Sequence, residues 1–125
     1  MDNKQFVLTA ITDVFVKRDI TAFDKYFDSN YKQHNPQIPN GTAPLKQMIP
    51  NLPVNFKYEP GIVAENGEYV MIHGRYEGWG EKPMIAVDIF KVTNGKISEH
   101  WDVMQEEISA DKTANGNAMF PILVN

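Results

Sequence analysis

One segment of the chain, residues 83–92, carries a carboxylate on an otherwise apolar strand face. Side chains alternate between the two faces of a strand, so Asp88 shares its face with Ala86 and Phe90. A carboxylate taken out of water needs hydrogen bonds, a shared proton, or a cavity that holds water or ligand. Asp88 is therefore a candidate general acid or base, and a structural carboxylate bonded by the backbone or by Arg75 is the alternative.

Two of the three histidines fall in segments that could face such a carboxylate. His73 lies in the alternating segment 68–79, where it is either a satisfied structural residue or a base that Asp88 orients from the neighbouring strand. His34 lies in a polar segment that also holds Tyr31 and Asn35, and segments of this kind often carry binding sites. Ordinary turn formation before a proline is the alternative for His34 and Asn35.

The last alternating segment, residues 96–108, has polar side chains on both faces. This pattern predicts that one face lines a wet pocket and that the other meets a partner. Without a bulge, Trp101 and Gln105 face inward, whereas His100 and Asp102 face outward as an exposed or interfacial ion pair. One extra residue in a bulge would reverse these faces.

Other kinds of chemistry lack their sequence signatures. The chain has no cysteine, which excludes a thiolate nucleophile and a cysteine-based zinc site. Paired-histidine spacing, a glycine-rich phosphate loop and a nucleophile elbow are also missing from the sequence. We therefore expect proton transfer and hydrogen bonding, with no metal and no cofactor.

Helices in the first half of the chain must position these residues. Apolar residues recur every three or four positions from residue 3 to 17, and this pattern predicts an amphipathic helix. A short second helix is expected after Thr21, and a third between residues 41 and 52. Residues 28–40 contain two prolines and several turn formers, which favour a loop or a short extended piece.

Beyond residue 53 the apolar period changes to two. Four strands are expected, at residues 54–65, 68–79, 83–92 and 96–108. Asn66-Gly67 and Asn94-Gly95 are typical of tight hairpin turns, so neighbouring strands should pair antiparallel. Helices followed by a meander indicate an α+β fold in which the helices cover one face of a curved sheet.

Length and composition set further limits. The 125 residues suit a single domain spanning 1–125, and the 42% hydrophobic content is ordinary for a globular chain. The net charge is −4 and the basic residues are scattered, so nucleic acid is not an expected partner. With no apolar run long enough to span a membrane and no leader pattern, we expect a cytoplasmic protein without a membrane partner.

Three segments carry a resemblance to a known family. YKQHNPQIPNG, VDIFKVTNGKISEHWDVMQ and NGNAMF, in this order, resemble SnoaL-like (polyketide cyclase-like) proteins of the nuclear transport factor 2-like superfamily. The resemblance implies a cone-shaped fold in which about three helices pack on a bent, mainly antiparallel sheet around a small-molecule pocket. It also implies a homodimer through the outer sheet face, where His100 and Asp102 are candidate contacts.

The same resemblance implies a reaction. SnoaL-type cyclases close a ring by intramolecular aldol condensation with a carboxylate acid/base and no cofactor. The cyclase aspartate would fall a few residues after the strand tryptophan, at Gln105, and an amide cannot remove a proton. The expected base is then Asp88, with His34 or His73 polarising a carbonyl and Gln105 or Asn35 bonding the oxyanion.

The leading hypothesis is therefore an acid/base enzyme, such as an aldol-type cyclase, isomerase or dehydratase, that acts on a small carbonyl or polyketide-like compound. Expected ligand-binding residues are Tyr31, Asn35, Phe90, Trp101 and Gln105. One alternative is a non-catalytic metabolite-binding domain that uses Phe90 and Trp101 as apolar walls. A bare dimerisation module is a third reading.

Overall fold

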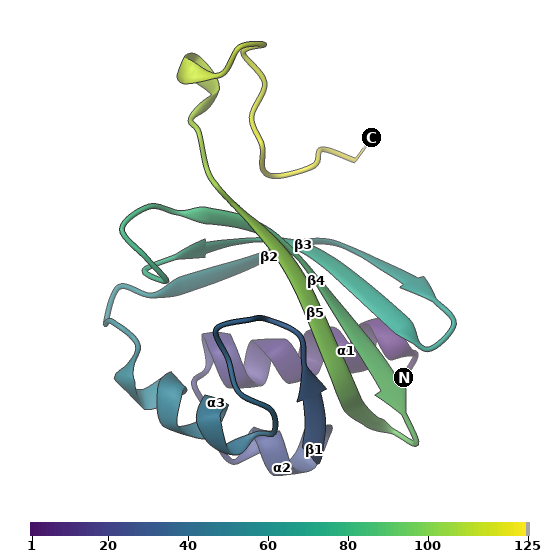
Figure 1. Ribbon diagram of the computed structural model, residues 1–125. Helices are drawn as coiled ribbons and strands as arrows, with labels where there is room; N and C mark the ends of the chain where they lie inside the picture. Colours follow the sequence, from purple (N-terminus) through teal and green to yellow (C-terminus); the bar gives the residue numbers. More distant parts are fainter. Residues whose placement is uncertain (125) are drawn as a thin grey trace.

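The computed structural model describes residues 1–124 and shows helices packed on one face of a five-stranded sheet (Figure 1). The helical elements are α1 (Asn3–Ile11), a π-helical continuation (Thr12–Val16), α2 (Ala22–Tyr26), α3 (Ala43–Met48) and two 3-10 turns (Ile49–Asn51 and Ala110–Lys112). The strands are β1 (Phe27–Gln33), β2 (Lys57–Asn66), β3 (Tyr69–Glu77), β4 (Met84–Thr93) and β5 (Lys96–Glu106). The predicted α+β architecture with helices on one side of a curved sheet is confirmed.

The first helix forms where the apolar period predicted it. Asp2 caps its start, because the Asp2 carboxylate accepts a hydrogen bond of 2.8 Å from the backbone N–H of Gln5. The buried stripe consists of Val7, Ala10, Ile11 and Val14. The stripe continues through the π-helical segment, so the predicted helix over residues 3–17 is confirmed in position and changes its winding in the last turn.

The sheet has the strand order β1-β5-β4-β3-β2. Strands β2 to β5 pair antiparallel in chain order, as the hairpin turns predicted. At the β4–β5 turn, Asn94 and Gly95 have φ values of 52° and 75°, which asparagine and glycine tolerate best. The remaining strand, β1, lies in the segment expected to be a loop or short extended piece, and it pairs parallel with β5, which places Gln33 opposite His100.

A bulge in β5 decides which of its residues face the helices. Val92 pairs with Ile97, whereas Lys91 pairs with Glu99, so Ser98 is an extra residue in β5. Beyond Ser98 the two faces of β5 exchange relative to a regular hairpin. His100 then continues the buried face that begins at Ile97, and Asp102 follows it.

This bulge overturns the inward and outward faces expected for a regular strand. Trp101 and Gln105 were expected on the pocket side, and the structure places Gln105 along a groove on the opposite face with Val103. His100 and Asp102 were expected outside as partner contacts, and both line the interior. The prediction for a strand without a bulge is therefore wrong for all four side chains, and the alternative with a bulge describes β5.

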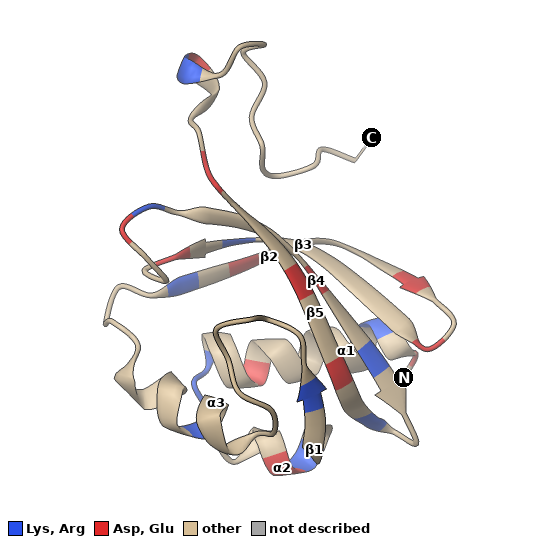
Figure 2. Ribbon diagram, viewed as in Figure 1, with Lys and Arg blue, Asp and Glu red and all other residues tan. Residues whose placement is uncertain are grey.

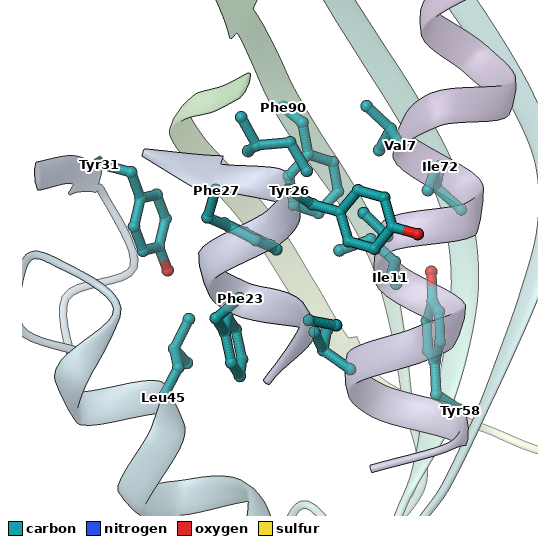
Figure 3. Close-up of a cluster of buried hydrophobic side chains, with 14 of the residues drawn as sticks. Val7, Ile11, Phe23, Tyr26, Phe27, Tyr31, Leu45, Tyr58, Ile72 and Phe90 are labelled. Atoms are coloured by element: carbon teal, nitrogen blue, oxygen red, sulfur yellow. The ribbon is translucent and has the colours of Figure 1, made fainter. Parts of the chain in front are cut away.

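The core fills the space between the helices and the inner sheet face. Figure 3 shows side chains from α1 and α2 packed toward Ile72 of β3 and Phe90 of β4. Phe23 and Ile72 are fully buried and Phe90 is 5% exposed. Burying a large apolar side chain stabilises the fold by roughly 1.5–3 kcal/mol, so this layer holds the helices on the sheet.

The chain after β5 lies on the opposite side of the sheet from the helices, where it turns back toward the strands (Figure 1). Phe120 packs there against His73 of β3, with a ring-centre distance of 5.6 Å. The apolar residues Leu123 and Val124 that follow are exposed. Among residues 1–124, no helix is long and apolar enough to cross a membrane.

Candidate active site

A pocket lies between the inner sheet face and the helices. Its volume between the side chains is about 30 Å³, enough for one water molecule, within a wider hollow of about 450 Å³ that includes space open to solvent. The walls are mostly apolar and consist of Ile11, Phe15, Phe27, Tyr31, Gln33, Ile38, Leu45, Met48, Tyr76, Trp79, Asp88, Phe90, His100, Asp102 and Met104.

Asp88 of β4 is the more enclosed of the two carboxylates in this pocket. Its side chain is 3% exposed. The Tyr76 hydroxyl donates to Asp88 Oδ2 at 2.8 Å, and His100 Nε2 lies 2.8 Å from Asp88 Oδ1. Both carboxylate oxygens therefore have protein partners, which satisfies the requirement for burying such a group.

His100 of β5 connects Asp88 to the end of β1. Its Nε2 atom faces Asp88, and its Nδ1 atom lies 2.6 Å from the side-chain oxygen of Gln33. The imidazole is 9% exposed, and its ring packs against the Phe90 ring at 4.8 Å. His100 is thus fixed at both nitrogens and on one ring face.

Asp102 is the carboxylate with free capacity. Its side chain is 7% exposed, and its Oδ2 accepts a hydrogen bond of 2.8 Å from the Asn35 amide. The distance from Asp102 Oδ2 to His100 Nε2 is 3.9 Å, too long for a hydrogen bond. Within residues 1–124, Asp102 Oδ1 has no hydrogen-bond partner, so it is the oxygen that a ligand can reach.

The charges of the cluster do not balance by themselves. Asp88 and Asp102 are direct cross-strand partners, and like charges in this position repel. His100 can supply one positive charge, and none of the wall residues is a lysine or arginine. Figure 2 shows the basic positions spread over separate elements. The pocket therefore holds two carboxylates beside one imidazole, and these are the residue types that general acid/base catalysis uses.

Three tyrosines around the cluster have raised pKa values, and one of them, Tyr76, donates to Asp88. Burial raises the pKa of Tyr76 well above its usual value near 10, and the Asp88 carboxylate raises that pKa further. Burial followed by the charge of Asp88 also raises the pKa of Tyr58, whose ring packs 4.5 Å from the Tyr76 ring. The pKa of Tyr31 is raised mainly by burial, against the lowering effect of its hydrogen bond with Gln33.

The Tyr31 hydroxyl is placed to serve a ligand. Its oxygen accepts a hydrogen bond of 2.9 Å from the Gln33 amide. Its hydrogen has no acceptor among residues 1–124 and remains available for a ligand oxygen. Tyr31 and Asp102 both line the pocket, so a hydrogen-bond donor and a carboxylate face the same space.

Several residues expected at the site do lie there. Asp88, Phe90 and Tyr31 line the pocket. Asn35 is 8% exposed and reaches the pocket through its hydrogen bond to Asp102. These four residues come from β4, from β1 and from the segment after β1, so the fold brings together residues more than 50 positions apart in sequence.

Other expected residues lie elsewhere, and their predicted place in the pocket is wrong. The His34 ring stacks on Trp101 at 4.7 Å, and His34 Nε2 bonds Glu99 at 2.6 Å, away from the pocket walls. His34 and Trp101 point outward because each neighbours an inward residue, Gln33 or His100, along its strand.

His73 lies on the outer sheet face. Its ring packs against Phe120, and it lines the outer groove with Gln105 and Met119. It follows Ile72, whose side chain is buried in the core, so the alternation of β3 turns His73 away from Asp88. The prediction that Asp88 orients His73 is therefore wrong.

The sequence reading missed Gln33 and placed His100 and Asp102 on the wrong face. The sequence did contain a signal for the bulge. With regular pairing from the Asn94-Gly95 turn, Glu99 would lie opposite Phe90 and its charge would fall on the apolar face. The extra residue of the bulge shifts the pairing by one position, so His100 lies opposite Phe90 in place of Glu99. Gln33 lacked such a signal, because its inward position depends on the pairing of β1 with β5.

The same three side chains are also of the types that bind metal ions. Asp88, His100 and Asp102 each offer one ligand atom, and these atoms lie within 4.8 Å of one another. His100 Nε2 and both oxygens of Asp88 already bond protein groups. The observed geometry is thus that of a hydrogen-bonded cluster.

Comparison with known proteins agrees with this architecture. A family model described as the SnoaL-like domain matches residues 8–100. No protein with curated function is similar enough to match. A solved nuclear transport factor 2-like protein of unknown function from Cytophaga hutchinsonii is 18% identical, with a TM-score of 0.71, over 84% of this chain and 91% of that one.

Two further solved structures have names that refer to reactions. A provisionally named ketosteroid isomerase from Kribbella flavida is 16% identical, with a TM-score of 0.70, over 84% of this chain and 78% of that one. A provisionally named polyketide cyclase from Bacillus cereus is 24% identical, with a TM-score of 0.59, over 70% and 64% of the two chains. At these identities the similarity concerns the fold. On the match to most of its length, this chain belongs to the SnoaL-like domain family and has the nuclear transport factor 2-like fold.

Proposed function

We propose that this chain is a cofactor-independent acid/base enzyme that acts on a small carbonyl compound, with Asp102 as the residue that moves the proton. One observation carries this proposal: Asp102 is a nearly buried pocket carboxylate whose Oδ1 has no protein partner among residues 1–124. Asp88, the base expected from the sequence, has both oxygens bonded to protein groups. Asp102 is therefore better suited than Asp88 to contact a substrate.

The proposed chemistry uses the donor and the carboxylate on either side of the pocket. Asp102 Oδ1 removes a proton from the carbon beside the substrate carbonyl, and the electron pair moves into the carbonyl to give an enolate. The Tyr31 hydroxyl donates a hydrogen bond to the enolate oxygen, and Asn35 holds Asp102 in place. In a cyclisation the enolate carbon attacks a second carbonyl, and the alkoxide that forms takes the proton back from Asp102. In an isomerisation protonated Asp102 returns its proton to another carbon of a conjugated enolate.

The apolar walls support a substrate with a mainly hydrocarbon body. Aromatic rings and methionines form most of the lining around the polar cluster. The narrow space of about 30 Å³ requires some wall side chains to move, and the flexible side chains of Met48 and Met104 can do so with little strain. The names of the two similar structures, an isomerase and a cyclase, both refer to reactions that proton transfer of this kind can drive.

A ligand screen tests the proposal first. Acetophenone, larger aromatic ketones and polyketide fragments would be scanned for an increase in thermal unfolding temperature and then for turnover. Asp102→Asn keeps the shape of the side chain and should lower kcat on any substrate found by about 10²–10⁴-fold, whereas Glu106→Gln on the exposed end of β5 should leave kcat unchanged. Ligands that bind both variants tightly and are never converted would favour the alternative of a metabolite-binding domain.

We also propose that two copies pair through the outer face of the sheet. Val87 and Val103 lie on that face and are 38% and 73% exposed, which is unusual for valines in the middle of a sheet. His100 and Asp102, the contacts expected from the sequence, lie inside and take no part. The exposed valines are the supporting observation for this pairing.

A further inference from the structure

We propose that Gln33 is a positioning residue that keeps a proton on Nδ1 of His100 and so directs Nε2 of His100 toward Asp88. This inference deepens the proposed acid/base function and rests on it for its purpose. The part of it that the structure supports directly is the position of the proton on His100 Nδ1. The expected consequence is a His100–Asp88 pair that is neutral overall beside Asp102.

The orientation of the Gln33 amide follows from its backbone partners. The Gln33 Oε1 atom accepts hydrogen bonds from the backbone N–H groups of His34 and Asn35, at 3.1 and 3.0 Å. Only an oxygen can accept from two N–H groups, so the amide cannot be turned around. On its other side, the Gln33 amide nitrogen donates to Tyr31 at 2.9 Å.

This orientation determines the proton on His100. Gln33 Oε1 lies 2.6 Å from His100 Nδ1, and an amide oxygen can only accept. Nδ1 must therefore carry a hydrogen, and in histidine the partner of one ring nitrogen decides the state of the other. His100 Nε2 then shares a single proton with Asp88 Oδ1, either as imidazolium with carboxylate or as imidazole with carboxylic acid.

The arrangement links the pocket groups in a defined order. Gln33 bonds His100, His100 bonds Asp88, and Asp88 accepts from Tyr76. The same glutamine donates to Tyr31, the proposed donor to the substrate oxygen. Gln33 can therefore hold both the His100–Asp88 pair and the oxyanion donor without touching the reacting atoms itself.

Nitrogen-15 NMR of the histidine rings in the full chain tests this proposal without a substrate. The three histidines are assigned with His34→Asn and His73→Asn variants. In the unmodified protein, His100 should show a slowly exchanging proton on Nδ1. Gln33→Met removes the acceptor and should abolish this signal, whereas Gln33→Glu keeps an acceptor oxygen and should retain it.

The control is Gln47→Met, an exposed glutamine of α3, which should leave the Nδ1 signal unchanged. An unprotonated Nδ1 in the unmodified protein, or an unchanged signal in Gln33→Met, would overturn the proposal. If Gln33→Met fails to fold, the test rests on the comparison of Gln33→Glu with the unmodified protein. Loss of the Nδ1 signal in Gln33→Glu would also overturn the proposal.

The outcome is separable from that of the proposed function. The Nδ1 signal can behave as expected in a chain that converts no ketone, and then the enzyme proposal fails while the proton placement stands. With a substrate in hand, Gln33→Met should lower kcat more than it changes KM, because Gln33 acts through His100 and Tyr31. A change confined to KM would contradict a positioning role.

Discussion

The two faces of the sheet depart from the usual distribution of polar and apolar side chains at a few positions each. On the inner face, Asp88, His100 and Asp102 are at least nine-tenths buried and held by hydrogen bonds. On the outer face, Val103 of the same strand β5 is 73% exposed. Buried charges are costly and exposed valines gain nothing, so neither face is explained by stability alone. The proposed acid/base function of the inner face and the proposed pairing through the outer face would each account for one side of this difference.

The largest effect expected from this comparison concerns the inner ion pair. Asp88→Ala leaves His100 and the Tyr76 hydroxyl buried without their shared partner and should lower the free energy of unfolding by about 3–5 kcal/mol. The matched outer change is Glu99→Ala, which removes the half-exposed pair with His34 and should cost about 1 kcal/mol or less. Urea unfolding of both variants measures the contrast, and equal costs would refute it.

A smaller effect is expected from the buried tyrosines at high pH. Because the pKa of Tyr58 is raised in the folded chain, the unfolded chain releases this proton first as the pH passes 10. Stability is therefore complete below pH 10 and falls above it, by at most about 1.4 kcal/mol per pH unit for this tyrosine. Tyr58→Phe should flatten the fall in thermal unfolding scans between pH 9 and about pH 11.

The half-exposed Tyr69 provides the control for the alkaline scans. Tyr69→Phe removes a hydroxyl from a ring that is 38% exposed, so it controls for the loss of a tyrosine as such. The Tyr58 hydroxyl has no hydrogen-bond partner among residues 1–124, so Tyr58→Phe should cost little at neutral pH. An unchanged alkaline slope in Tyr58→Phe would contradict the raised pKa.

The smallest effect on the free energy of unfolding is expected for a substitution on the outer face. The same substitution should have a large effect on the association of two chains. Val103→Lys should change the free energy of unfolding of a single chain by no more than about 0.5 kcal/mol, since the residue is largely exposed. It should convert the proposed dimer into a monomer in light-scattering measurements, and Lys82→Ala, at an exposed loop position, should not. A dimer that tolerates Val103→Lys would show that another surface makes the contact.

Most of the fold could be predicted from the sequence, because it depends on local patterns. The apolar period of α1, the Asn-Gly turns and the alternation of β2 to β5 are each readable within a few residues. β1 was less readable, since its parallel pairing with β5 joins segments about 70 residues apart. Phe27 and Tyr31 bury their side chains in that strand, but polar residues stand between them.

The site was only partly predictable, and one residue accounts for most of the errors. Ser98 adds a bulge that reverses β5, and the sequence favoured the other face because Trp101 and Val103 are apolar. Apolar side chains point inward in most sheets, yet Trp101 and Val103 lie at outward positions of β5. Asp88 and Phe90 precede the bulge along the hairpin on β4, so their inward positions could be read correctly.

The most direct test of the central claim is proton exchange at a ketone in D₂O. Acetophenone would be incubated with the unmodified chain, with Asp102→Asn and with Glu106→Gln, and loss of its methyl proton signal would be followed by NMR. The account predicts exchange well above the buffer rate for the unmodified chain and Glu106→Gln, and a rate at least about 10²-fold lower for Asp102→Asn. Equal enzyme-dependent rates in Asp102→Asn and the unmodified chain would contradict the claim that Asp102 moves the proton.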